Sequence, residues 1–200
     1  ADVAGLAHAV GLGNVYITNG YMTPALLEDL GETLDAANVD LKAFRDDFYR
    51  QMCGARLQPV LDSLLTMKRL GVWVEVTTLL IPGANDDPGE LRELAGFIAG
   101  DLGPETPWHV SRFHPTYKLT DRPSTPSATL EMASRIGREA GLQHIYVGNL
   151  PGHGETTRCT RCGRPLIERF GFQVMKNHLV NGRCPHCQTP LAGRGLAETA

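Results

Sequence analysis

The 200-residue sequence lacks a long apolar run and an export signal. No stretch approaches the roughly eighteen apolar residues of a membrane-spanning helix, and no charged start leads into an apolar segment. We therefore expect a protein of the cytoplasm without a membrane partner. Low-complexity tracts are absent too, and no internal repeat is visible beyond an alternation of strand-like and helix-like segments. A starting methionine is also missing, which leads us to expect a piece of a longer protein.

Cysteine is scarce, but four of the five cysteines form two Cys-x-x-Cys pairs near the C-terminal end. The pairs Cys159/Cys162 and Cys184/Cys187 are separated by twenty-one residues, which is close to the spacing of zinc ribbons. Four thiolates complete a tetrahedral site and leave no position for a substrate, so we expect a structural zinc ion. A rubredoxin-like iron site and two disulfides are the alternatives, and the lack of an export signal disfavours disulfides.

The net charge of -3 is the balance of a basic C-terminal segment and an acidic remainder. Residues 156–190 hold six Lys or Arg against one acid, and the rest of the chain holds thirteen against twenty-one. A basic segment can contact nucleic acid, but a solvated surface is the commoner explanation of such a balance. Charge alone therefore gives no reason to expect a nucleic-acid partner.

Apolar, β-branched segments alternate with helical patterns up to residue 149, which indicates β/α units around a parallel sheet. Thr23-Pro24 and Thr125-Pro126 each predict a helix start with a hydroxyl N-cap before a proline. In the expected helix over 57–70, Leu57, Val60, Leu61, Leu64, Leu65 and Met67 fall on one face, and Gly71 ends it. Five strands are too few for an eight-stranded barrel, which leaves a partial barrel, an open sheet or a fragment. The expected strands cover residues 14–18, 37–41, 72–81, 108–113 and 144–147.

A change of composition after Asn149 divides the chain. We expect a β/α body over residues 1–150, a linker over 151–158, a zinc ribbon over 159–190 and a disordered tail over 191–200. Between the two cysteine pairs, residues 165–180 suit a β-hairpin. Because the hairpin module is too small to fold on apolar burial alone, we expect metal binding to supply much of its stability.

Polar residues follow the expected strands, at the edge where parallel β/α folds bind ligands. Thr18-Asn19-Gly20 follows the first strand, and Asp40 and Lys42 lie two apart on one face at the end of the second. His114 follows the fourth strand. Opposite charges at Asp40 and Lys42 would suit a zwitterionic ligand.

The order Thr18-Asn19-Gly20, Asp40-Leu41-Lys42, Leu80-Ile81-Pro82-Gly83 and Phe113-His114 resembles the later strands of radical S-adenosylmethionine enzymes of the glycyl-radical-activase type. With the segment from Trp108 to Lys118 and a terminal ribbon, the chain is most similar to the radical SAM member of the AmmeMemoRadiSam system. The resemblance implies a partial (β/α)6 barrel with S-adenosylmethionine across the strand ends. It places Thr18, Asn19, Gly20, Asp40 and Lys42 at the amino acid and ribose parts of that cofactor, and His114 at the nucleoside side.

The resemblance also implies a [4Fe-4S] cluster, but the Cys-x-x-x-Cys-x-x-Cys loop that would hold it is absent from the sequence. That loop belongs to the first strands, which would lie before Ala1. We therefore expect the C-terminal part of a radical SAM enzyme, inactive alone and without catalytic residues of its own. In the full-length enzyme, an electron donor and the cofactor would serve hydrogen abstraction from an unidentified substrate, with proteins among the candidates.

Two other functions remain open at this point. One is a zinc-ribbon module on a β/α scaffold that binds protein or nucleic acid, and the other is a lyase or isomerase with His114 and Asp40 as acid and base. Four further residues have plain structural interpretations. Cys53 is expected to be a small buried side chain, His186 a surface histidine and His109 a packed or surface strand residue, while Glu75 on its Val-rich strand is equally consistent with an interior group and an outward charge.

Overall fold

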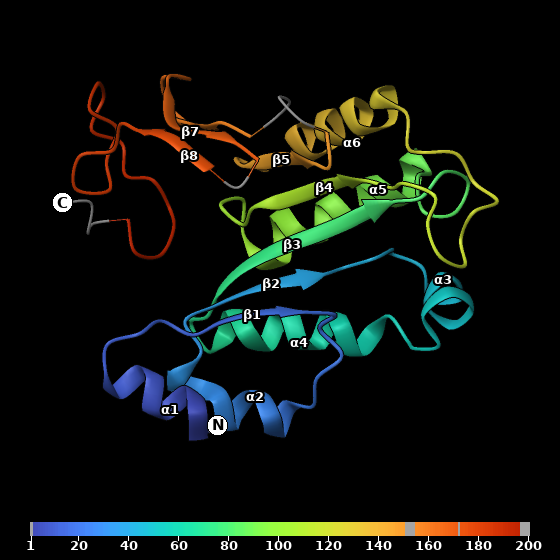
Figure 1. Cartoon of the computed structure of the whole chain (residues 1–200), viewed down its shortest axis with the longest axis horizontal. Helices are drawn as coiled ribbons and strands as arrows, with labels where there is room; N and C mark the ends of the chain where they lie inside the picture. Colours follow the sequence, from blue (N-terminus) through green and yellow to red (C-terminus); the bar gives the residue numbers. More distant parts are fainter. Residues whose placement is uncertain (1, 151–154, 172, 197–200) are drawn as a thin grey trace.

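The computed structural model describes residues 2–150, 155–171 and 173–196. Its larger part is a five-stranded parallel sheet in which the strands neighbour one another in chain order, β1 to β5. All five arrows point the same way in Figure 1. Each expected strand is confirmed to within one residue at either end. The strands are β1 (Val15–Thr18), β2 (Ala36–Asp40), β3 (Trp73–Leu80), β4 (Trp108–Arg112) and β5 (Ile145–Gly148).

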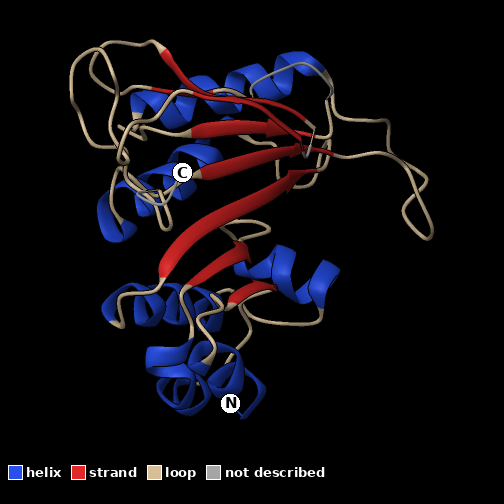
Figure 2. Ribbon diagram, turned by 60° about the vertical axis from the view of Figure 1, so that its left-hand side comes forward, coloured by secondary structure: helices blue, strands red, loops and turns tan. Residues whose placement is uncertain are grey.

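Helices connect the strands and flank the sheet (Figure 2). The Thr23 side chain accepts a hydrogen bond from the Leu26 N–H, which confirms this N-cap. The helix expected over 57–70 forms with Val60, Leu64 and Met67 buried, but Leu65 lies outside the apolar face with 39% of its surface exposed. The helices are α1 (Asp2–Ala9), α2 (Pro24–Leu30), α3 (Asp46–Phe48), α4 (Gln58–Arg69), α5 (Pro88–Phe97) and α6 (Ser127–Glu139), with short turns η1 (Gly31–Thr33), η2 (Tyr49–Cys53) and η3 (Ile98–Leu102). None of the helices in the described ranges is long and apolar enough to span a membrane.

The prediction that Thr125 caps a helix is wrong. Helix α6 begins at Ser127 after Pro126, without a side-chain cap. The Thr125 hydroxyl instead accepts the Phe113 N–H at 2.8 Å and donates to the Leu80 carbonyl at 2.6 Å, in a fully buried position. The hydroxyl therefore joins the ends of β3 and β4, because both strands leave backbone groups there that need buried partners.

The two faces of the sheet differ in polarity. Burial alternates along the strands, and on the face toward the helices it gives a core that includes Val39, Val76, Leu80, Trp108 and Val110. Parallel pairing keeps residues in register on a common face, and most side chains on the opposite face of β2 to β5 are polar. We call this the inner face. Its side chains include Asn38, Asp40, Glu75, Thr77, His109, Ser111 and Tyr146.

A second sheet of three antiparallel strands forms the C-terminal part, with β6 (Thr157–Arg158), β7 (Pro165–Phe170) and β8 (Gln173–Asn177). The expected hairpin between the cysteine pairs is confirmed. This sheet begins at Thr157, before the expected ribbon boundary at 159, because Thr157 pairs with Ile167. Its separate core holds Cys159, Leu166, Ile167, Leu179 and Cys184.

Residues 191–196 of the expected tail belong to the described part of the chain. Leu191 and Leu196 pack against the ribbon core, and the expected disorder of the tail stays a prediction. Residues 151–154 of the expected linker and 197–200 of the tail lie outside the described residues.

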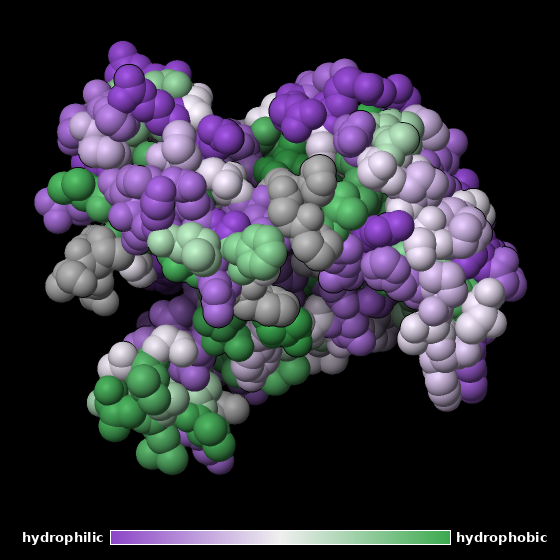
Figure 3. Space-filling model, turned by 45° about the horizontal axis from the view of Figure 1, so that its top comes forward, coloured by the Kyte–Doolittle hydropathy of each residue, from purple (hydrophilic) through white to green (hydrophobic). Residues whose placement is uncertain are grey.

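Apolar side chains remain exposed at the β1 end of the sheet. Val3 and Leu6 of α1 and Val10 directly after it are 72–80% exposed, and Ile17 of β1 is 80% exposed. Figure 3 shows hydrophobic residues gathered on the lobe at lower left, where Figure 1 places α1. An exposed cluster of this kind is typical of a surface that another structure covers.

Candidate functional site

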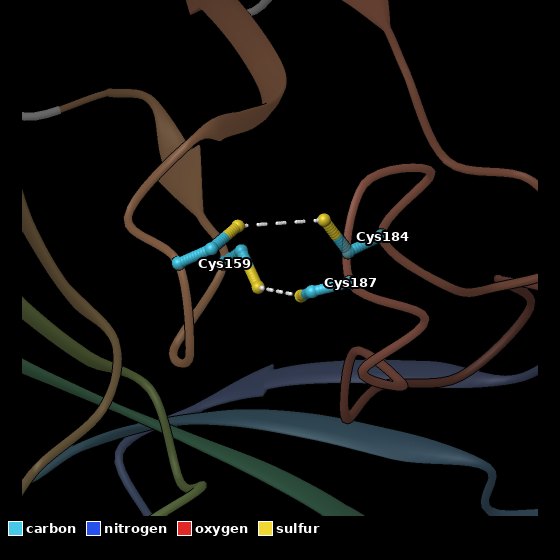
Figure 4. A group of neighbouring side chains, drawn as sticks. Cys159, Cys184 and Cys187 are labelled. Carbon is cyan, nitrogen blue, oxygen red and sulfur yellow. Dashed lines mark hydrogen bonds between the residues drawn. The ribbon is translucent and has the colours of Figure 1, made fainter.

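The four ribbon cysteines come together at one point. Their sulfur atoms all lie within 4.8 Å of one another, with 3.4 Å between Cys159 and Cys187 and 3.7 Å between Cys162 and Cys184. Figure 4 shows the sulfurs of the two loops facing each other. A bond length of about 2.3 Å from zinc to sulfur corresponds to about 3.8 Å between sulfurs of a tetrahedron. The arrangement therefore fits a single ion, and the four cysteines are free thiols rather than disulfides.

Each cysteine pair occupies a knuckle with the same backbone pattern. The Cys159 N–H donates to the Arg164 carbonyl, and the Cys159 carbonyl accepts from the Gly163 N–H, both at 2.9 Å. Cys184 makes the equivalent bonds with Thr189 and Gln188, also at 2.9 Å. The residue after the second cysteine has positive φ in both knuckles, 71° at Gly163 and 59° at Gln188. The sequence similarity of the two motifs thus corresponds to a structural repeat.

The electrostatics of the cluster favour a bound cation. Hydrogen bonding from the Thr189 side chain and backbone lowers the pKa of Cys187 to about 6. At Cys162 the Arg164 backbone favours the thiolate, but desolvation and the three neighbouring thiols outweigh it and raise the pKa to about 11. Four sulfurs this close do not all ionise without a compensating charge, and a divalent ion supplies it.

His186 lies at the surface, as expected, whereas Cys53 is only partly buried. His186 is exposed, and its Nδ1 lies 2.6 Å from Arg164 Nη1 of the other knuckle, so it is not among the four clustered ligands. Cys53 is partly buried against the main core, and desolvation raises the pKa of its thiol.

The turn after β1 is held by its own side chains. Thr18 Oγ1 accepts the Gly20 N–H at 3.1 Å, and Asn19 Oδ1 accepts the Tyr21 N–H at 3.0 Å. Gly20 has φ of 71°, and a Cβ there would lie 2.6 Å from Val39 Cγ1. The residue must therefore be glycine, because only glycine lets the turn pack this closely against β2.

Asp40 and Lys42 meet at the end of β2, with 2.8 Å between Oδ2 and Nζ. Two neighbours fix this segment, because the Lys42 N–H donates to the Tyr49 hydroxyl at 3.0 Å and the Lys42 carbonyl accepts from Asn85. Burial raises the pKa of Tyr49 to about 12, so this hydroxyl keeps its proton. The buried Asn85 also donates to the Leu79 carbonyl at 2.9 Å and thus ties the ends of β2 and β3 together.

His114 lies in the loop after β4, exposed, with Nδ1 3.2 Å from Ser124 Oγ. It lines the same cleft as Glu75 and His109. The structure thus brings His114 to the carboxyl edge of the sheet, as expected, while its contact with a nucleoside stays a prediction.

The inner face contains a polar pair that the sequence did not identify. Glu75 Oε2 lies 2.7 Å from His109 Nε2, and Glu75 Oε1 accepts the Trp73 Nε1–H at 3.2 Å. Glu75 is therefore an interior group, and His109 packs by stacking on Tyr146 with 5.2 Å between ring centroids. The available signal was the two-residue alternation of Glu75 and Thr77 on a strand otherwise rich in valine.

These features define an α/β protein with polar residues at the carboxyl edge of a parallel sheet and a separate four-cysteine module. Residues 2–95 match the family model of the Radical SAM superfamily. The chain is 46% identical, over 189 residues and 93% of its length, to Uncharacterized protein MJ0808 of Methanocaldococcus jannaschii. It spans 56% of the length of that relative.

Solved structures show the same fold. A domain of pyruvate-formate lyase-activating enzyme from Bacteroides vulgatus is similar with a TM-score of 0.65 and 13% identity, over 74% of this chain and 88% of that one. Streptococcus suis SuiB is similar with a TM-score of 0.60 and 9% identity, over 74% of this chain and 35% of that one. A radical SAM methyltransferase from Sphaerobacter thermophilus is similar with a TM-score of 0.54 and 18% identity, over 69% of this chain and 41% of that one. The expected fold class is confirmed: a five-stranded parallel α/β sheet with neighbours among radical SAM proteins and a C-terminal four-cysteine cluster.

Proposed function

We propose that this chain is the C-terminal part of a radical S-adenosylmethionine enzyme that abstracts hydrogen from a substrate. The match of residues 2–95 to the Radical SAM superfamily carries the proposal. It is supported by the motif order Thr18-Asn19-Gly20, Asp40-Leu41-Lys42 and Phe113-His114, which lies along one edge of the sheet. Within that superfamily, the segment from Trp108 to Lys118 and the ribbon favour the AmmeMemoRadiSam member.

The residues of this chain do not fit a [4Fe-4S] cluster. The sequence has no Cys-x-x-x-Cys-x-x-Cys loop, and Cys53 is remote in sequence from the other cysteines. The ribbon sulfurs lie within 4.8 Å of one another, as around one ion, whereas four irons with separate ligands need a wider shell. We therefore assign the ribbon a structural zinc ion and place the cluster ligands in a part of the longer enzyme outside this chain.

The strand edge does fit S-adenosylmethionine. Asp40 and Lys42 are partly exposed and offer opposite charges, as the amino acid group of that cofactor requires. Thr18 and Asn19 hold the turn, so their contribution is to present its backbone. When bound and reductively cleaved, S-adenosylmethionine supplies a radical that abstracts hydrogen. This chain's residues bind and orient it.

The test uses a longer protein that contains this chain and its upstream segment, purified and reconstituted anaerobically with iron and sulfide. We expect S-adenosylmethionine to be cleaved to 5′-deoxyadenosine on reduction with dithionite, and Asp40→Asn to weaken S-adenosylmethionine binding at least about tenfold. The matched control is Asp62→Asn, which removes an exposed carboxylate from α4. Absence of both cluster and cleavage in the longer protein would instead favour a metal-stabilised binding module.

A further inference from the structure

A cleft of about 1020 Å³ lies between the inner face of the sheet and the β7–β8 hairpin. Glu75, His109 and Tyr146 line it from three neighbouring strands, and Arg169 and Phe170 line it from the hairpin. The cleft is thus walled by both parts of the chain. Its volume suits a small organic ligand, which pockets of this kind usually hold by apolar walls and a few polar groups.

Glu75 fixes one imidazole nitrogen of His109, a residue that lines the cleft. Glu75 accepts the hydrogen bond of His109 Nε2, and stacking on Tyr146 fixes the plane of the ring. Nδ1 of His109 makes no hydrogen bond with any of the described residues. A histidine oriented in this way offers a polar atom at a defined position to a ligand.

Arg169 supplies a cation at the same place. Its Nη1 donates to the Thr157 hydroxyl at 2.8 Å and to the Glu155 carbonyl at 3.4 Å, and its guanidinium lies 6.0 Å from the Tyr146 ring centre. The Glu155 carboxylate accepts the Gly171 N–H instead. Among the described residues Arg169 has no carboxylate within 4.0 Å, so its remaining donors are available to an anion.

His144 lies near the cleft but does not line it. It is 5% exposed, and its Nε2 is buried with no hydrogen-bond partner in the described chain. It lines a second cavity of about 440 Å³, which shares Glu75, Tyr146 and Arg169 with the cleft. Because this nitrogen is buried, a molecule in either cavity does not reach it, and His144 is not counted among the ligand contacts.

We propose that the cleft binds a small planar carboxylate, with its anionic group on Arg169, its plane against Tyr146 and Phe170, and a hydrogen bond to His109. Glu75 is hydrogen-bonded to His109 and Glu155 to the hairpin backbone, so neither carboxylate occupies the remaining donors of Arg169. The binding site stands on this chain alone. Only the further step, that the carboxylate is the substrate of the radical enzyme, rests on the proposed function.

The test compares benzoate with benzamide, which has the same shape and no charge, by calorimetric titration of the zinc-loaded chain. We expect benzoate to bind with a dissociation constant of about 1 mM or lower, and benzamide at least about tenfold more weakly. Equal binding of the two probes, or no binding of benzoate, would overturn the proposal. Because neither probe needs the iron cluster or S-adenosylmethionine, the result is independent of the test of the proposed function.

Variants locate the site. Arg169→Met should weaken benzoate binding at least about tenfold, and Arg169→Lys, which keeps the charge, should lose less. Lys176→Met is the matched control, because it removes an exposed cation from the other strand of the same hairpin. Zinc content and melting temperature show that each variant is folded. An equal loss in Lys176→Met and Arg169→Met would show general charge attraction and refute a site at Arg169.

Discussion

His109 and Glu75 meet across neighbouring strands on the inner face of the sheet, with 2.7 Å between Nε2 and Oε2. The contact is diagonal, because His109 is in register with Thr77, two residues beyond Glu75. The second carboxylate oxygen of Glu75 accepts from the Trp73 indole. Burial raises the pKa of Glu75, but the hydrogen bond and charge of His109, aided by Trp73 and Arg169, more than offset burial, and the pKa lies below its ordinary value.

The contact predicts that the variant His109→Leu begins to lose stability at a higher pH than the parent protein when acid is added. A carboxyl with a lowered folded pKa stabilises the fold above its unfolded pKa, about 4.3 for glutamate, and that contribution is lost as the pH falls through the folded value. Without His109, the effect of burial dominates and the pKa of Glu75 rises. The stability that the ionised Glu75 contributes is therefore lost at a higher pH. Carbon-detected NMR titration of Glu75 and acid unfolding measure both effects. His114→Leu, in an exposed loop, should leave Glu75 unchanged, and an unaltered Glu75 titration in His109→Leu would contradict the assignment.

Metal removal should unfold the ribbon and spare the body. The two hydrophobic cores are separate, and the ribbon core is small and includes two of the metal ligands. We expect a chelator, or Cys184→Ser at a fully buried position, to increase hydrogen exchange at Ile167 and Leu179, while Val76 and Leu80 stay protected.

The control for this experiment is Cys53→Ser, which alters the remaining cysteine outside the metal cluster. It should leave zinc content and ribbon protection unchanged. Protection of Ile167 that persists after complete metal removal would show that the ribbon folds without the ion. Cadmium or iron in place of zinc would preserve the protection, since thiolates bind these ions as well.

The strands and the metal cluster could be predicted because their signals are local. Buried parallel strands are runs of β-branched residues, and a Cys-x-x-Cys pair forms its knuckle within a few residues. The pairing of Glu75 with His109 could not be predicted, because it joins positions 34 residues apart and depends on strand register. The N-cap prediction for Thr125 was wrong for a related reason. A threonine before a proline has the local features of an N-cap, whereas its actual hydrogen bond to the Leu80 carbonyl depends on the packing of β3 against β4.

Gly20 should be intolerant of alanine. Positive φ costs a non-glycine residue about 1–2 kcal/mol, and a Cβ 2.6 Å from Val39 Cγ1 and 3.0 Å from Val60 Cγ1 adds overpacking of about 1–3 kcal/mol. Gly54→Ala is the matched control, because Gly54 has φ of 62° and nothing within 4 Å of an added Cβ. Urea unfolding should therefore show a loss of about 2–5 kcal/mol for Gly20→Ala and about 1–2 kcal/mol for Gly54→Ala. Equal losses would mean that the turn moves freely away from β2.

Gln188→Gly should strengthen the second metal knuckle. Gln188 holds the position that glycine holds in the first knuckle, with φ of 59° against 71° at Gly163. Removing the Cβ relieves about 1–2 kcal/mol of backbone strain and costs about 0.5–1 kcal/mol in unfolded-chain entropy, which leaves a gain of about 0.5–1 kcal/mol. Because folding of the ribbon and metal binding are coupled, this gain corresponds to roughly two- to fivefold tighter zinc binding in competition with a chelator.

Two variants separate backbone strain from side-chain effects in this knuckle. Gln188→Ala keeps the Cβ and removes only the weak 3.4 Å contact of Nε2 with the Pro185 carbonyl, so its zinc affinity should stay close to that of the parent. Gly163→Ala introduces the backbone strain into the first knuckle. It should weaken zinc binding by about as much as Gln188→Gly strengthens it. If Gln188→Ala bound zinc as tightly as Gln188→Gly, the gain would come from loss of the glutamine side chain. Relief of backbone strain at positive φ would then not explain it.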